Sequence, residues 1–205
     1  MNKEKAKMDL YNFHWLNQPG QFRIGDDTVT IVTEPMTDFW QRTYYGFRHD
    51  NAHAFLALVP RKEFSFIVKA KWVPEKRFDQ CGVILYQDEN NWFKASVEYD
   101  NEQFSRLGSV VTNQGYSDWA TTDIDSACHQ LFYRLSRRGQ DFLIESSEDG
   151  YDFRQMRIFH MVAPIDQAKI GVYACSPLDS SIEAVFSDFA LEDCAWALYA
   201  DPDQA

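Results

Sequence analysis

The sequence lacks an apolar run long enough to span a bilayer, and its first residues, MNKEKAKMDLYNF, lack the hydrophobic stretch of a signal peptide. Cysteine is also scarce. The 205 residues include four cysteines, which form no C-x-x-C pair: Cys81, Cys128, Cys175 and Cys194. We therefore expect reduced thiols in a cytoplasmic protein that does not associate with a membrane.

Basic residues are fewer than acidic ones. The chain has 20 Lys and Arg and 31 Asp and Glu, which gives a net charge of −11. Such a chain repels a phosphate backbone, and the basic pair Arg137-Arg138 is too short to form a nucleic-acid surface. The sequence also lacks a Gly-rich phosphate loop, a Gly-x-Ser-x-Gly elbow and a recognisable Cys/His dyad. We expect no nucleic-acid partner and no cofactor.

Aromatic residues, by contrast, make up 16% of the chain and favour strands. Eleven segments alternate as strands do: 28–33, 54–59, 64–73, 80–87, 91–99, 109–113, 130–136, 141–147, 155–161, 169–175 and 182–191. Short polar turns between them indicate antiparallel hairpins. The pattern predicts an all-β chain, a two-sheet antiparallel sandwich or jelly roll, that forms one domain over 1–205 and ends in a loose tail, YADPDQA.

The segment NWFKASVEY (91–99) has two distinct faces when it is read at the two-residue repeat of a strand. One face carries Phe93, Ala95, Val97 and Tyr99 and is suited to a core. The other face carries Trp92, Lys94, Ser96 and Glu98. By the same alternation, Gln80 and Tyr86 of 80–87 and Arg134 of 130–136 point away from the core. We expect these polar and aromatic side chains to line a groove on the outer face of the more curved sheet.

The segment GYSDWATT (115–122) reads as a loop and adds Ser117, Asp118 and Trp119 to this candidate site. Sugars stack their C–H faces on indole rings and need paired hydrogen-bond donors and acceptors for their hydroxyls. This inventory favours a carbohydrate or a related small polyhydroxylated ligand. The alternative is structural: Trp119 folds back on the core and Asp118 caps a turn.

The stretch FDQCGVILYQDENNWFKASVEYDNEQFSRLGSVVTNQGYSDWATT (78–122) resembles domain-of-unknown-function family 1349. The resemblance extends to TDFWQRTYYGFRHDNAHAF (37–55), SSEDGYDFRQMR (146–157), GVYACSP (171–177) and FSDFAL (186–191). It implies a concanavalin A-like sandwich, the fold of legume lectins and several glucanases. It implies no established activity, since one fold hosts many functions.

Three functions therefore stay open. The first is a binding module without catalysis. The second is a glycoside-processing enzyme, because EYDNE (98–102) fits a Glu-x-Asp-x-Glu motif in which Glu98 would act with Asp100 or Asp118. The third is a protein-interaction domain that uses the same groove. The segments HDNAH (49–53) and QDENN (87–91) hold metal-ligand residue types without a ligand spacing, so we expect no metal site.

Overall fold

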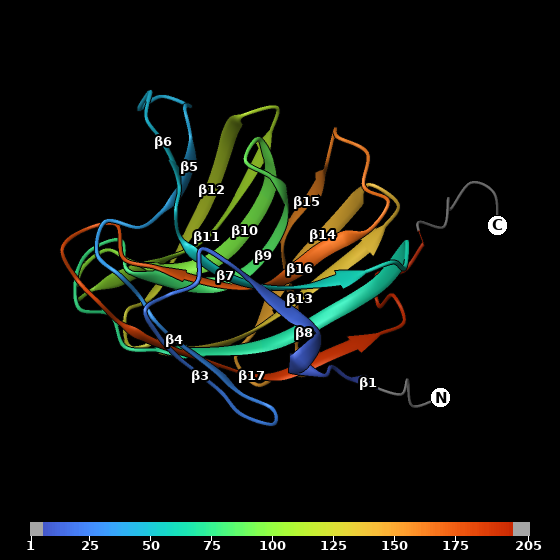
Figure 1. The fold of residues 1–205 in the computed structure, drawn as a ribbon, viewed down its shortest axis with the longest axis horizontal. Coiled ribbons are helices and arrows are strands. Elements are labelled where there is room, and N and C mark those ends of the chain that lie inside the picture. Colours follow the sequence, from blue (N-terminus) through green and yellow to red (C-terminus); the bar gives the residue numbers. More distant parts are fainter. Residues whose placement is uncertain (1–5, 199–205) are drawn as a thin grey trace.

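The computed structural model describes residues 6–198, so the predicted tail at 199–205 lies outside the described residues. The chain folds as two antiparallel sheets packed face to face, which confirms the predicted all-β sandwich (Figure 1). A single turn of 3-10 helix, Leu10–Asn12, is the one helix among the described residues. The described residues form no helix that is long and apolar enough to cross a membrane.

The larger sheet has eight strands in the order β15-β14-β13-β8-β17-β4-β3, with β1 pairing with β17. Its strands are β1 Ala6–Lys7, β3 Gln21–Ile24, β4 Val29–Val32, β8 Glu63–Trp72, β13 Gln130–Arg138, β14 Asp141–Ser147, β15 Arg154–His160 and β17 Glu183–Glu192.

The second sheet has seven strands in the order β12-β11-β10-β9-β16-β7-β2. Its strands are β2 Phe13–Leu16, β7 His53–Val59, β9 Gln80–Asp88, β10 Asn91–Tyr99, β11 Phe104–Asn113, β12 Tyr116–Asp125 and β16 Ala168–Cys175. A separate hairpin, β5 Phe39–Gln41 with β6 Arg48–Asp50, projects from the sandwich beside this sheet (Figure 1).

The expected strands are all present, but the prediction of a loop at 115–122 is wrong. This segment belongs to β12, which pairs with β11 from Asn113↔Tyr116 to Phe104↔Asp125. The turn between them holds Gln114 and Gly115, both at positive φ. A polar sequence forms a strand here because β11 supplies a partner for its backbone groups along the whole length.

Two apolar clusters form, one on each face of the seven-stranded sheet. The main core lies between the sheets and contains Phe93, Ala95 and Val97, as the alternation predicts. The second cluster lies on the outer face, where Phe39 and Trp40 of the β5–β6 hairpin pack over Trp92 and Val110. The hairpin therefore covers part of the outer face and leaves the rest open.

Candidate functional site

A groove of about 360 Å³ remains on the outer face of β9–β12, beside the β5–β6 hairpin. Its floor consists of Gln80, Lys94, Ser96 and Glu98. These four residues lie on the same face because Glu98 is paired with Gln80 and Ser96 with Gly82 in neighbouring strands. The volume lies at the lower end of the range for small-molecule sites.

A chain of polar contacts joins the two sides of the floor. Lys94 Nζ donates to Asp38 Oδ1 at 3.0 Å and to Gln80 Oε1 at 3.1 Å. Gln80 Nε2 donates in turn to Glu98 Oε2 at 2.9 Å. Lys94 and Gln80 are buried, whereas Asp38 and Glu98 are partly exposed. The two carboxylates are therefore the ends of this chain of contacts that face the open groove, and the buried residues between them hold both in place.

The hydroxyl of Tyr173, from β16, completes this arrangement beneath the floor. It lies 2.9 Å from Gln80 Oε1 and 2.7 Å from Ser96 Oγ. Lys94 Nζ also sits 5.5 Å from the centre of the Tyr173 ring. These contacts fix the orientation of the Gln80 amide, with its oxygen toward Lys94 and its nitrogen toward Glu98.

The carboxyl group of Glu98 has a raised pKa. Its pKa is raised from 4.5 to about 7, chiefly by burial; the charge of Lys94 lowers the pKa, and the charges of Asp38 and Asp100 raise it. The pKa of Lys94 is lowered by burial but raised by Asp38, and the net direction is upward. At neutral pH the floor therefore contains a fixed ammonium next to a carboxyl group that exchanges its proton.

Aromatic rings form the walls of the groove. Trp40, Tyr45, Phe47 and His49 line one side, and Trp119 of β12 lines the groove as well. The Tyr45 and Phe47 rings are stacked with their centres 5.4 Å apart, and Phe47 lies 4.9 Å from His49. Tyr45 is 54% exposed, Phe47 is 44% and Trp119 is 40%, so apolar ring surface remains open to solvent beside the polar floor.

Three of the predicted site residues lie under the hairpin instead of in the groove. Trp92 is fully buried against Phe39, and the Tyr86 hydroxyl donates to Asp50 of β6 at 2.8 Å. Ser117 Oγ accepts the backbone N–H of Gln41 at 3.0 Å. These contacts attach the β5–β6 hairpin to the sheet, so Tyr86, Trp92 and Ser117 support the groove wall.

Arg134 and Asp118 do not face the groove. Arg134 lies in β13 of the other sheet and forms two hydrogen bonds with Glu145, at 2.6 and 2.8 Å. Asp118 is next to Trp119 in β12 and therefore points to the opposite side, where it pairs with Arg157 at 2.6 Å. The strand alternation that places Trp119 in the groove excludes Asp118.

The three acidic residues of the motif EYDNE (98–102) do not lie together. Glu98 lies in the groove, whereas Asp100 follows the end of β10 and pairs with Arg77 at 3.0 Å and with Arg106 at 2.9 Å. Glu102 is exposed in the turn. The second carboxylate that does line the groove is Asp38.

The described residues contain no cluster of three or more metal-ligating side chains. His53 uses both ring nitrogens in the fold, since Nε2 accepts the Glu34 N–H at 3.1 Å and Nδ1 lies 2.7 Å from the Asn17 carbonyl. Asp88 accepts hydrogen bonds from Asn90 and Asn91 and so closes its own hairpin turn. His53 therefore serves a tertiary contact and Asp88 a local turn.

Sequence reasoning did not identify Asp38 or the aromatic wall as parts of the site. The available signal was the density of aromatic residues in TDFWQRTYYGF (37–47), a segment that belongs to no predicted strand. An aromatic-rich segment outside the core pattern is typical of a binding surface or a packed flap, and this hairpin both packs on the sheet and lines the groove.

Comparisons with known proteins agree with this fold. The family model described as "Protein of unknown function (DUF1349)" matches residues 15–194. "Regulation of enolase protein 1" of Saccharomyces cerevisiae is 30% identical over 191 residues, which cover 92% of this chain and 93% of that protein. The crystal structure of a functionally unknown protein from Saccharomyces cerevisiae has a TM-score of 0.85 at 27% identity, over 92% of this chain and 100% of that one.

A more distant similarity concerns the fold alone. The GH43 protein BlXynB from Bacillus licheniformis is 15% identical and has a TM-score of 0.65, over 94% of this chain and 41% of that one.

Proposed function

We propose that this chain, which belongs to the DUF1349 family, is a binding protein for a saccharide or a related polyhydroxylated ligand. The description of the family states no function. The ligand occupies the groove and leaves unchanged. Because the family match spans 15–194, we treat the chain as one binding domain. We assign it to the cytoplasm, the compartment that the sequence predicts.

The observation that carries this proposal is the combination of exposed rings with a polar floor that is already organised. Trp119, Tyr45 and Phe47 offer apolar faces for the C–H surface of a sugar ring. Asp38 and Glu98 offer carboxylate oxygens to its hydroxyls. Since Lys94 and Gln80 already hold these carboxylates, little side-chain freedom is lost on binding.

Calorimetric titration with a panel of neutral oligosaccharides tests the proposal. Trp119→Ala removes one wall, and we expect it to weaken binding at least tenfold while the fold is retained. The matched control is Tyr151→Ala, which removes an aromatic ring that is 86% exposed outside the groove. No heat with any saccharide, or an equal loss in both variants, contradicts the proposal.

One observation favours a second candidate, glycoside processing. Glu98, with a pKa near 7, and Asp38 lie in the same groove, and glycosidases use a pair of carboxyl groups on either side of the bond that they cleave. The ion pair between Asp38 and Lys94 favours binding instead, because it neutralises the carboxylate that would act as nucleophile. Release of reducing ends from the same panel would decide for the enzyme.

A further inference from the structure

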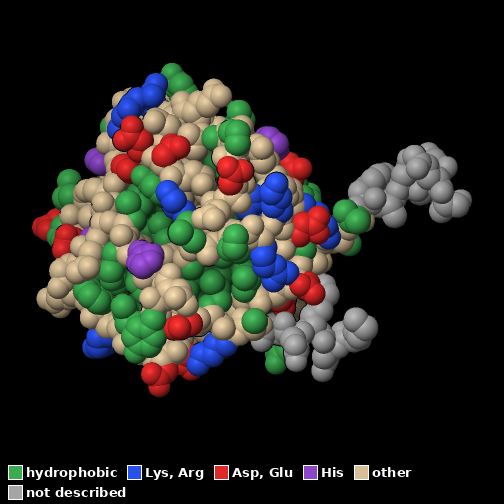
Figure 2. Space-filling model, turned by 45° about the vertical axis from the view of Figure 1, so that its right-hand side comes forward, with side chains coloured by type: hydrophobic (Ala, Val, Ile, Leu, Met, Phe, Trp, Pro, Cys, Tyr) green, Lys and Arg blue, Asp and Glu red, His purple; other side chains and the backbone are tan. Residues whose placement is uncertain are grey.

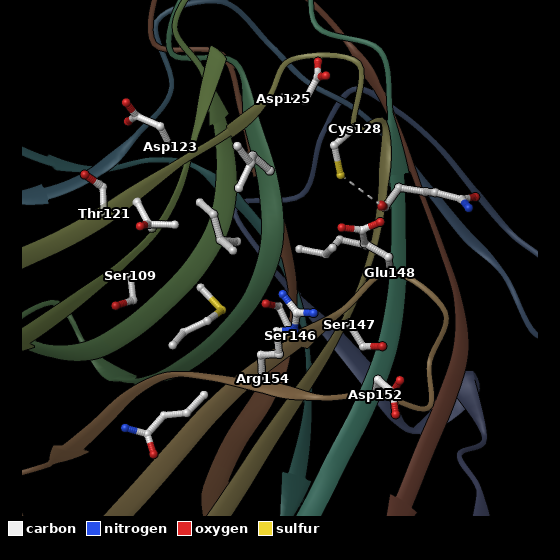
Figure 3. Close-up of a pocket in the computed structure, with 18 of the residues that line it drawn as sticks. Ser109, Thr121, Asp123, Asp125, Cys128, Ser146, Ser147, Glu148, Asp152 and Arg154 are labelled. Atoms are coloured by element: carbon white, nitrogen blue, oxygen red, sulfur yellow. Dashed lines mark hydrogen bonds between the residues drawn. The ribbon is translucent and has the colours of Figure 1, made fainter.

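A second and larger cavity lies between the two sheets, where β11 and β12 face β14 and β15. This interlayer cleft has a volume of about 1130 Å³, above the usual range for small-molecule sites. Figure 3 shows Ser109, Thr121 and Asp123 on one side of it and Ser146, Ser147 and Arg154 on the other. It is separate from the floor of the groove, because its lining comes largely from the inner face of β11–β12.

Some core-facing positions in this cleft are small and polar. Ser109 lies between Leu107 and Val111 in the alternation of β11, and Ser146 follows Ile144 in β14 in the same way. Thr122 is paired with Leu107 and also faces inward. Sandwich interiors are normally filled by apolar side chains from both sheets. Here the sequence leaves the corner open, and hydroxyl groups share its lining with apolar side chains such as Leu107, Ile124 and Met156.

At one end, side chains join the two sheets. The Asn113 amide donates to the His160 carbonyl at 3.0 Å and accepts the Val162 N–H at 2.9 Å, which is the pair of bonds that a residue of an added strand makes. Arg157 donates to the Asp118 carboxylate and to its backbone carbonyl. Side chains thus take the place of a strand partner at this end.

At the other end the strand edge is open. β12 is the last strand of its sheet, and residues 119–124 have no strand on their outer side within the described part of the chain. Most of these residues are exposed, and the segment contains neither Pro nor Lys, which commonly protect an edge from pairing; Asp123 is its one charged residue. The backbone here is a template for one more strand.

The charge around this end is acidic. Five acidic residues line the cleft, Asp123, Asp125, Glu148, Asp149 and Asp152, against the single Arg154. Asp123 pairs with Arg106, and Asp149 accepts backbone N–H groups of its own loop. None of Asp125, Glu148 and Asp152 forms an ion pair with another described residue.

We propose that the interlayer cleft binds an extended, lysine- or arginine-rich segment of another protein, which adds a strand to the open edge of β12. Its backbone pairs with residues 119–124, and its cations meet Asp125, Glu148 and Asp152. The six open residues span about 20 Å, so about six residues of the segment pair with the edge. This partner site adjoins the proposed saccharide groove, with which it shares Trp119 of the β12 edge and Gly108 and Ser109 of β11.

Fluorescence anisotropy with a labelled (Thr-Lys)5 peptide tests the proposal on the full chain. The triple variant Asp125→Asn, Glu148→Gln, Asp152→Asn should weaken binding at least tenfold. The charge-matched control is Asp26→Asn, Asp27→Asn, Glu183→Gln, which neutralises exposed carboxylates on β17 and the β3–β4 turn, away from the cleft, and should change affinity less than twofold. Hydrogen exchange should slow in β12 when the peptide is bound.

Two further peptides separate strand pairing from charge alone. A (Thr-Lys)5 analogue with N-methyl groups on the backbone nitrogens of the second and third Thr and the second and third Lys has the same charge but lacks ladder donors on both edges, and it should bind at least tenfold more weakly. A (Thr-Glu)5 peptide should not bind. The proposal is overturned by equal binding of the N-methylated analogue, by equal loss in both triple variants, or by no binding of (Thr-Lys)5 at 1 mM, a concentration that detects even a weak interaction of about −4 kcal/mol.

Discussion

Lys94 and Asp38 form an ion pair of 3.0 Å between the middle of β10 and the segment that precedes β5. The Lys94 side chain is 5% exposed and that of Asp38 is 19% exposed. Asp38 also accepts the N–H of Phe39, the first residue of the hairpin. The pair therefore links the groove floor to the base of the groove wall. On the molecular surface, charged side chains are interspersed with hydrophobic ones (Figure 2).

Lys94→Met keeps the length of the side chain but leaves Asp38 without its cation and the Gln80 oxygen with one donor fewer. We expect a loss of about 3 kcal/mol in unfolding free energy, because a buried charge is left uncompensated. Urea denaturation measures the change. The control Arg23→Met breaks an exposed pair with Glu183 and should cost less than about 1 kcal/mol. Equal effects of the two variants would show that burial adds nothing to the Lys94–Asp38 pair.

Glu98 makes stability depend on pH. Between pH 4.5 and about 7 the unfolded chain loses this proton while the folded chain keeps it, so the unfolding free energy falls as pH rises and levels off above pH 7. The Glu98→Gln variant has no titrating group at this position, so its unfolding free energy does not fall in this way. Its stability relative to the parent should increase from pH 5 to pH 8, by at most about 3 kcal/mol.

Thermal and urea unfolding at several pH values measure that difference. Glu102→Gln, at an exposed carboxylate in the turn after β10, is the control, and the change with pH should be larger for Glu98→Gln than for this variant. A flat profile for Glu98→Gln would mean that Glu98 titrates as an ordinary carboxyl group.

Gly82 in β9 lies directly opposite Ser96 of β10. A Cβ atom at this position would overlap the carbonyl oxygen of Ala95, so Gly82→Ala must push β10 away. We expect a loss of about 1–3 kcal/mol in stability and weaker ligand binding, since Lys94 and Glu98 move with the strand. Gly20→Ala is the control, because its nearest neighbour is the movable carboxylate of Glu34, and a comparable loss there would contradict this explanation.

Cys81 and Cys175 are fully buried, and burial raises the pKa of both thiols. Since the thiolate is the reactive form, a disulfide reagent should leave both unmodified in the folded protein and modify both after denaturation. Cys128 is partly exposed and should react earlier, although burial also raises its pKa. Mass spectrometry of the modified peptides measures the order. Early modification of Cys81 would show that the core opens readily.

The prediction from alternation succeeded where the information is local. In NWFKASVEY the backbone alone sets which side chains share a face, and Phe93, Ala95 and Val97 do pack in the core. The same rule placed Gln80, Lys94 and Glu98 together on the outer face. It also predicted a single continuous polar row, which the structure divides into a covered half with Trp92 and Tyr86 and an open half.

That division was decided by tertiary structure. The β5–β6 hairpin covers Trp92 because Phe39 packs on it, and the partner of Lys94 is Asp38, which lies 56 residues earlier in the chain. Likewise, β12 is a strand because β11 pairs with it, although its own residues read as a loop. Alternation reports the geometry of one segment, whereas the covering of an outer face depends on contacts between distant segments. The sequence by itself determined the sandwich and the two faces of its strands, and only long-range packing selected the residues that remain open to a ligand.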